Sequence, residues 1–258
     1  MTEAPSFGSL KLASPDDVLR LGVVCTAGFR YSEQFIWERT AHAQYPQSTM
    51  NWFRQEVMEF IRKPEFIALV ALDDYDPDES SKTEAIIPVD NGWTPPKAGT
   101  PVVVGLGVWR LQPGSPRIGK YQNETGPYPD VPEYDYKDLD RKRSQAFAHV
   151  CIEAGKKYFE GLSEMERIVV HPAYWRRGHG STIAKWGVQL ADIDSVDQGV
   201  LATSMGADLF RHVGYELITD LHVEGDEKNP EGVTFAALKH TATLKAKGKW
   251  TVFSCTVI

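Results

Sequence analysis

The chain has 258 residues, of which 42% are hydrophobic and 24% charged, with a formal net charge of −7. This composition is ordinary for a globular protein, and the acidic balance argues against a dedicated nucleic-acid binder, which needs clustered Lys and Arg. No apolar stretch approaches the roughly 18 residues of a membrane helix, and residues 1–10 lack the basic start and apolar run of a secretory signal. The three cysteines are widely spaced and form no zinc or disulfide pattern, so we expect a cytoplasmic protein that holds no metal.

The first 72 residues predict two strands with two helices between them. Leu10–Ala13 is a short apolar strand, and Ser14, followed by proline and two acids, is typical of a helix start that accepts a backbone N–H. A second helix is expected after Ser48, because apolar residues recur at helical spacing through residues 50–61. Phe66–Leu72 is an uninterrupted apolar run, which predicts a buried strand.

Two long segments interrupt the pattern that follows. Residues 73–101 carry an acidic cluster and a Pro-Pro pair with few core residues, which indicates an exposed inserted loop. After the strand Val102–Arg110, residues 112–160 form a second insertion, in which a loop rich in Tyr and Pro precedes a helix near Phe147–Tyr158. We predict a single domain over residues 1–258, with a C-terminal extension at about 241–258.

The most informative segment follows the strand Met165–Val170. Pro172 ends that strand, because proline donates no hydrogen bond into a sheet, and a helix is expected from about Gly178. The first N–H groups of a helix have no internal partner and carry partial positive charge, so a diphosphate can bind there. Gly178 and Gly180 leave such a group room to approach the backbone.

Two common phosphate-binding motifs do not fit this turn. A P-loop requires Gly-Lys-Ser/Thr, which is absent here. The dinucleotide fingerprint requires a further glycine three residues after Gly180, where Ile183 stands. The strand, glycine turn and helix therefore need another interpretation.

The sequence here resembles the GCN5-related N-acetyltransferase (GNAT) superfamily, whose signature Gln/Arg-x-x-Gly-x-Gly/Ala follows a strand ending in Val-x-Pro. The matching residues are Val170-His171-Pro172 and Trp175-Arg176-Arg177-Gly178-His179-Gly180. A second stretch resembles the family's next strand and the helix that ends in Gly-Tyr, at Gly199–Ser204 and Gly206–Tyr215. The resemblance implies an α/β (α+β) fold, with a mixed, mostly antiparallel splayed sheet flanked by helices. The two long inserted loops do not match the minimal family pattern and are predicted from the residues alone.

The sequence departs from the family pattern at two positions. Trp175 stands at the Gln/Arg position, which is tolerable if backbone N–H groups bind most of the diphosphate. Phe210 stands where many members place the tyrosine thought to protonate the leaving thiolate, which puts the usual general acid in doubt.

The resemblance also implies where acetyl-CoA binds and which groups move protons. It assigns the cofactor to Val170, Trp175, Arg176, Arg177, Gly178, His179, Gly180 and Ser181. Glu166 and Glu164 occupy positions where members carry a catalytic Glu or His, and residues two apart in a strand share a face. The acid candidates are Ser204, Tyr215, His212 and water, and His171 is a further candidate base.

The resemblance implies an acetyl-CoA-dependent N-acetyltransferase in which an amine attacks the thioester directly. We expect a small-molecule amine acceptor, no nucleic-acid or membrane partner, and a monomer or homodimer. Two alternatives stay open, namely a GNAT-fold protein that binds CoA or another ligand without turnover, and a GNAT-fold enzyme diverted to other chemistry on a small metabolite.

Overall fold

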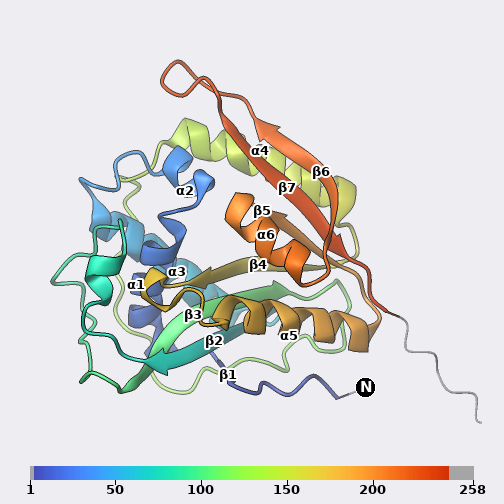
Figure 1. Ribbon diagram of the computed structural model, residues 1–258, viewed down its shortest axis with the longest axis horizontal. Coiled ribbons are helices and arrows are strands. Elements are labelled where there is room, and N and C mark those ends of the chain that lie inside the picture. The colour runs from blue at the N-terminus through green and yellow to red at the C-terminus, as the bar shows by residue number, and fades with distance from the viewer. Residues whose placement is uncertain (1–2, 244–258) are drawn as a thin grey trace, which may run out of the picture.

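A computed structural model describes residues 3–243, and its centre is a seven-stranded mixed sheet of order β1-β2-β3-β4-β5-β7-β6 (Figure 1). The strands are β1 (Leu10–Leu12), β2 (Phe66–Asp74), β3 (Pro101–Arg110), β4 (Ser163–Val170), β5 (Gln198–Ala202), β6 (Glu216–Val223) and β7 (Val233–His240). Every pair of neighbours is antiparallel except β4 and β5, which are parallel. The predicted mixed, mostly antiparallel sheet is therefore confirmed.

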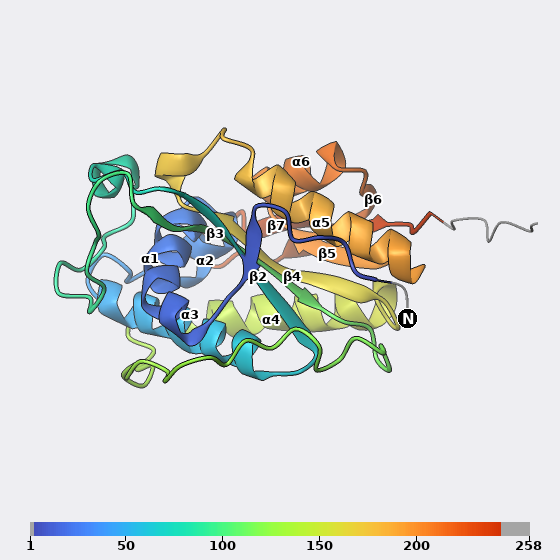
Figure 2. The same cartoon turned by 90° about the horizontal axis from the view of Figure 1, so that it is seen from below.

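Helices cover both faces of the sheet (Figure 2). One face carries α1 (Val18–Phe29), α2 (Glu33–Glu38), α3 (Pro46–Arg62) and α4 (Arg141–Tyr158), and the other carries α5 (His179–Asp194) and α6 (Ser204–His212). Three 3-10 turns lie at η1 (Pro15–Asp17), η2 (Glu79–Lys82) and η3 (Pro172–Tyr174). Within the described residues, no helix is long and apolar enough to cross a membrane.

Alternating strand residues build a separate core on each face. Trp109 and Ile183 belong to the core beneath α5 and α6, whereas Val108 and Val169 belong to the core beneath α1 and α3. Gly187 allows α5 to approach the sheet closely, because a Cβ atom there would lie 2.1 Å from Nε1 of Trp109. This close packing fixes the position of α5 relative to the end of β4.

The sheet opens between β4 and β5. Their pairing covers only Ser163–Met165 against Gln198–Val200, while β4 stays paired with β3 up to Val170 and β5 stays paired with β7 up to Ala202. Because each strand keeps its outer neighbour but loses its inner one, their carboxyl ends diverge (Figure 1). This is the splay that the sequence resemblance predicts.

Several predicted boundaries and contacts need correction. Both strands that flank residues 73–101 extend into that range, so the β2–β3 connection is residues 75–100, and Glu79 within it is buried rather than solvated. The helix expected near Phe147–Tyr158 is confirmed as α4, although it begins earlier, at Arg141. Ser204 begins α6 instead of ending a strand, and the short helix α2 was not predicted.

Two further expectations concern the chain ends. At the start of η1, Ser14 donates from its backbone N–H and its hydroxyl to Asp17, at 2.9 Å each, so the acid accepts these bonds. Of the expected C-terminal extension, only residues 241–243 are described, and these are irregular; the remainder lies outside the described residues.

Candidate active site

The turn after β4 is held by its own side chains. His171 accepts a hydrogen bond at Nδ1 from the Ala173 N–H (3.2 Å), which starts the 3-10 turn η3. The indole N–H of Trp175 then donates to the Val170 carbonyl at 2.7 Å and ties the turn back to the strand end. The ring of Tyr31, just after α1, meets the Trp175 ring edge-on with centroids 5.0 Å apart. Trp175 thus has a structural contact at the position where the family places Gln or Arg.

The following residues expose their backbone N–H groups. Arg176 and Gly178 both adopt left-handed conformations, with φ of 63° and 89°. Thr182 donates to the Gly178 carbonyl at 2.9 Å, but among the described residues no acceptor faces the N–H groups of residues 176–181. A run of unpaired N–H groups at the positive end of α5 is suited to bind an anion. The predicted helix start at Gly178 is confirmed.

Cationic side chains surround the turn, and one carboxylate neutralises part of their charge. Asp73, on β2, accepts from Arg177 (3.0 Å) and His179 (2.8 Å). Burial acts to raise the pKa of Asp73, but its hydrogen bonds to His179, Asp74 and Arg177 hold it below its ordinary value. Arg176 is exposed, and no ion pair joins it to the described residues. Of the two arginines, Arg176 is therefore the one available to an arriving anion.

The opposite wall of the opening is formed by the start of α6. The Ser204 hydroxyl donates to Oε1 of Glu33 at the start of α2. The second oxygen of Glu33 is buried and has no hydrogen-bond partner among the described residues. A pair made of a hydroxyl and a carboxylate thus lies beside the end of β5.

A cavity of about 470 Å³ adjoins this pair. It is lined by Glu33, Ala202, Ser204, Ala207, Asp208, Arg211, Asp220, Glu231, Gly232, Thr234, Phe235 and Ala236. Four of these side chains are acidic and one is basic, so the lining is negatively charged at neutral pH. Its volume lies within the range of pockets that take small molecules.

Glu164 and Glu166 lie near the other end of β4. Arg110 contacts both carboxylates, at 2.6 Å and 2.7 Å, so the two glutamates share a face as expected. Burial raises the pKa of Glu164, while Arg110 opposes that shift. Glu166 precedes Val170 by four residues, which corresponds to about 13 Å along a strand. The structure thus places the pair near the closed end of the splay.

The other acid and base candidates are largely occupied within the fold. Phe210 is buried edge-on against Tyr215, whose hydroxyl donates to Gln198 inside the core and whose pKa is raised by burial. His212 is exposed on the last turn of α6. His171 is buried, and this lowers its pKa to about 4, so it is neutral near pH 7. Its Nδ1 already accepts the Ala173 N–H, which restricts any role as a base.

Comparison with known proteins identifies the family. A scan against protein-family models finds no match. A protein of Stachybotrys chartarum named "Acetyltransferase" is 32% identical over 234 residues, covering 89% of each chain. The chain belongs to the GNAT superfamily. It is an acetyltransferase with the GNAT fold, as its sheet topology and its relatives both indicate.

Solved structures of this superfamily share the fold at low sequence identity. One from Corynebacterium glutamicum, described as "histone acetyltransferase HPA2 and related acetyltransferase", is 13% identical, has a TM-score of 0.52 and covers 92% of this chain and 98% of its own. A putative arylalkylamine N-acetyltransferase 7 of the yellow fever mosquito is 11% identical, has a TM-score of 0.51 and covers 90% of this chain and 86% of its own. At these identities the likeness supports the fold alone.

The sequence does not predict two residues of the candidate site. Glu33 belongs to a six-residue helix whose amphipathic pattern is too short to recognise, and it meets Ser204 from 171 positions away. The polar composition of residues 73–101 predicts a solvated loop, yet Asp73 contacts Arg177 and His179 of the glycine turn. The only local sign that Asp73 has a role is its position directly after the apolar run Phe66–Leu72. No local pattern marks Glu33.

Proposed function

We propose that this GNAT protein transfers an acetyl group from acetyl-CoA to a small-molecule amine. The observation that carries the proposal is the run of unpaired N–H groups at residues 176–181, which lies at the open end of the β4–β5 splay. An anion bound there would direct its attached chain into the opening between the two strands. This is the arrangement that a thioester carrier with a diphosphate needs.

The turn fits the diphosphate of coenzyme A. At Gly180, an added Cβ would make only ordinary contacts, 3.4 Å from Leu209 and 4.0 Å from Val170. Internal packing therefore does not require glycine there, whereas the close approach of a bound group would. The N–H groups of residues 176–181 would hold the diphosphate, with Arg176 and Arg177 adding positive charge. The cofactor supplies an activated acyl group, and the Val170 N–H would polarise its carbonyl.

Glu33 and Ser204 are the side chains that we propose for proton transfer. Glu33 would take the proton of the attacking amine as the C–N bond forms. Ser204 would give its hydroxyl proton to the thiolate as the C–S bond breaks, and would recover a proton from Glu33. The sequence-derived candidates Glu166 and Glu164 remain the alternative bases, acting through water from the closed end of the splay.

The acidic cavity supports a cationic acceptor of small size. It begins at Ala202 and Ser204, so an amine held there would lie next to the strand end that faces Val170. Its acidic lining would attract an ammonium group, which would release one proton to solvent before it attacks. Glu33 would then take the second proton as the C–N bond forms. Of the expected acceptors, a small amine with a positive charge therefore fits best.

The cofactor site is tested by substitution of Gly180. Gly180→Glu places a carboxylate in the first turn of α5, where the helix dipole favours it, so the fold should persist. The same carboxylate would occupy the diphosphate position, so calorimetry should detect no CoA binding. Gly180→Ala is the matched control and should bind CoA. If Gly180→Glu bound CoA like the unsubstituted protein, the placement of the cofactor would be wrong.

Turnover is tested separately with acetyl-CoA and a panel of amines. Release of free thiol that depends on the amine supports the proposed function. Mono- and diamines that are positively charged should be better acceptors than amines that are uncharged or that carry an acidic group. CoA binding without thiol release across the panel would favour the non-catalytic alternative. Consumption of an amine without acetylation would favour diverted chemistry.

A further inference from the structure

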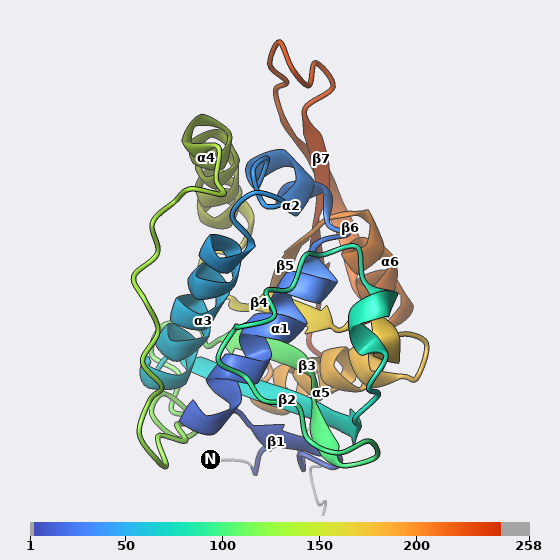
Figure 3. The same ribbon diagram turned by 90° about the vertical axis from the view of Figure 1, so that its left-hand side faces the viewer.

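The β2–β3 connection (residues 75–100) runs over the surface from the end of β2 to the start of β3 (Figure 3). In that view it crosses in front of α1, and η2 within it lies near η3. Nothing in the proposed function requires this segment. Its contacts nevertheless lead directly to the residues that precede the turn, which suggests a purpose beyond linking two strands.

Glu79 anchors the connection in the interior. It forms a two-pronged ion pair with Arg20 of α1, with one of the two contacts at 2.8 Å, and both residues are 4% exposed. Arg20 also donates to the Val103 carbonyl at 2.7 Å, and its guanidinium stacks 4.4 Å from the Trp93 ring centroid. All five N–H donors of a guanidinium demand partners when buried, so this set fixes Glu79 in one position.

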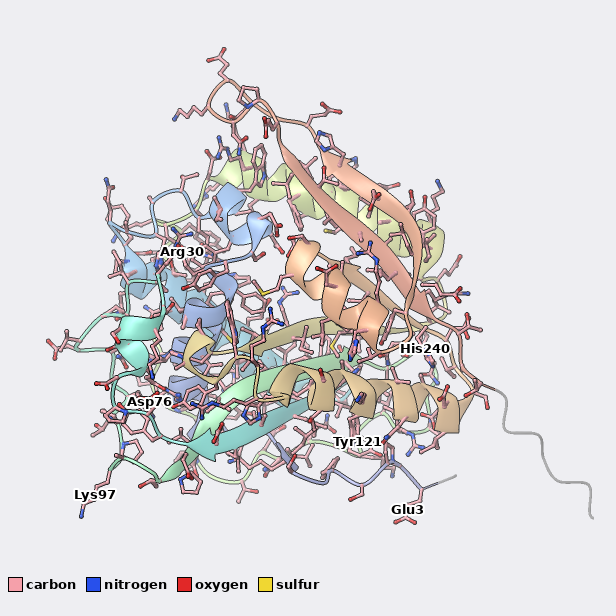
Figure 4. All side chains as sticks on the ribbon, in the orientation of Figure 1. Glu3, Arg30, Asp76, Lys97, Tyr121 and His240 are labelled. Carbon is pink, nitrogen blue, oxygen red and sulfur yellow. The ribbon has the colours of Figure 1, made fainter. Side chains whose placement is uncertain are left out.

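Tyr174 links this anchor to the cofactor turn. Its side chain is fully buried, and its hydroxyl donates to Oε2 of Glu79 at 2.9 Å. The same hydroxyl accepts the backbone N–H of Asp76 at 3.0 Å, so the connection holds the tyrosine from two sides (Figure 4, where Asp76 is labelled). Tyr174 is the last residue of η3 and lies two positions before Arg176.

Arg176 makes such support necessary. A non-glycine residue with φ of 63° is strained by about 1–3 kcal/mol, and it persists only where the surroundings determine its conformation. Within the exposed turn at residues 176–178, Arg177 donates to Asp73 at 3.0 Å and lies 5.0 Å from the ring centroid of Tyr174. The conformation of the turn therefore depends on the buried Tyr174 as well as on Asp73. A turn fixed before the cofactor arrives loses less conformational entropy on binding.

We propose that the β2–β3 connection is a positioning element for the cofactor turn, with Tyr174 and Glu79 as the positioning residues. Through Tyr174, the buried carboxylate of Glu79 keeps the N–H groups of residues 176–181 aimed at the diphosphate position. This inference rests on the proposed function for its ligand. The alignment of the turn itself is a property of the protein alone.

Tyr174→Phe tests the inference, because it removes one hydroxyl and leaves the Arg20–Glu79 pair intact. We expect the Kd for CoA and the KM for acetyl-CoA to rise about ten-fold, the factor that corresponds to one hydrogen bond to a charged group. The KM for the amine and kcat at saturating acetyl-CoA should stay unchanged. Amide hydrogen exchange at residues 175–182 should become faster in the variant without any ligand.

Tyr134→Phe is the matched control. The Tyr134 hydroxyl accepts from Arg39 at 3.3 Å beside a second buried pair, Arg39–Asp138, which lies in a different connection. Tyr134→Phe should lower the Tm by about as much as Tyr174→Phe does. It should not change the affinity for CoA or the amide hydrogen exchange of residues 175–182. Equal effects of the two variants, or none from Tyr174→Phe, would overturn the inference.

Failure of the proposed function would look different. If the unsubstituted protein had no affinity for CoA, the proposed function would fall, while hydrogen exchange would still decide whether the connection holds the turn. If it bound CoA and Tyr174→Phe bound equally well with unchanged exchange, only the positioning role would fall.

Discussion

Glu33 and Glu166 differ in what surrounds their carboxylates. Glu166 contacts Arg110 at 2.7 Å, and this ion pair holds its side chain in place. Glu33 accepts from the Ser204 hydroxyl, and its other oxygen is buried without a partner among the described residues. A buried, unpartnered carboxylate oxygen gains a hydrogen bond when an ammonium group arrives, whereas Glu166 would have to exchange one partner for another.

We therefore expect Glu33→Gln to reduce kcat by about 100-fold or more, the usual effect of removing a general base. CoA affinity should be retained, because the amide keeps the size of the side chain and lies away from the turn. Glu166→Gln should change kcat only a few-fold in comparison. Steady-state rates of thiol release, with calorimetry for CoA, measure both effects.

The opposite ranking would restore the base predicted from the strand position. If Glu166→Gln lost most of the turnover while Glu33→Gln kept it, proton removal would occur from the closed end of the splay. Ser204→Ala tests the Glu33–Ser204 pair in addition. Loss of the Ser204 hydroxyl should lower kcat without changing CoA affinity.

At the scale of elements, the two long connections are fixed by the same device. Arg20 of α1 holds the β2–β3 connection through Glu79, and Arg39 holds the β3–α4 connection (residues 111–140) through Asp138. Asp138 is fully buried and also accepts from the hydroxyls of Ser48 (2.9 Å) and Thr49 (2.7 Å). Each connection therefore carries a buried carboxylate that is satisfied only in the folded arrangement.

Asp138→Ala should consequently be strongly destabilising. It leaves the Arg39 guanidinium buried without its counter-ion, and breaking such a pair costs about 3–5 kcal/mol. Glu59→Gln, which removes an exposed pair with Lys63, is the control and should leave the free energy of unfolding nearly unchanged. Urea unfolding of both variants measures the difference. A loss of similar size in the two would show that Asp138 does not hold its connection.

At the scale of the molecule, sequence predicts what local patterns encode. The strand Met165–Val170, the glycine turn and the following helix each depend on neighbouring residues, and the structure confirms all three. The Arg20–Glu79 and Glu33–Ser204 contacts join positions 59 and 171 residues apart, and no local pattern marks such pairs. The polar composition of residues 73–101 predicts a solvated segment, although Glu79 is buried there and pairs with Arg20 of α1.

His42 lies between the β2–β3 connection and the β3–α4 connection and is hydrogen-bonded toward both. Its Nε2 accepts the backbone N–H of Ile86 at 3.1 Å, so Nδ1 carries the proton and donates to Thr49 Oγ1 at 2.9 Å. The Thr49 hydroxyl in turn donates to Asp138. This chain of hydrogen bonds requires a neutral imidazole, because a proton on Nε2 would displace the Ile86 N–H.

Burial, with a contribution from the positive charge of Arg30, lowers the pKa of His42 from 6.5 to about 4. Between these values the unfolded chain binds a proton that the folded protein does not. Stability is therefore fully present above pH 6.5 and falls as the pH is lowered toward 4. For this one group the slope is about 1.4 kcal/mol per pH unit, and buried His171 adds a similar contribution in the same window.

His42→Gln should remove the His42 share of this slope while the share of His171 remains. Urea unfolding at several pH values from 4.5 to 6.5 should give a stability curve about 1.4 kcal/mol per pH unit shallower than that of the unsubstituted protein. His222→Gln, on the exposed face of β6, is the control and should leave the slope unchanged. If His42→Gln and His222→Gln gave the same slope, the junction of the two connections would not be the source of the acid sensitivity, and it would have to be sought at His171 and the carboxylates.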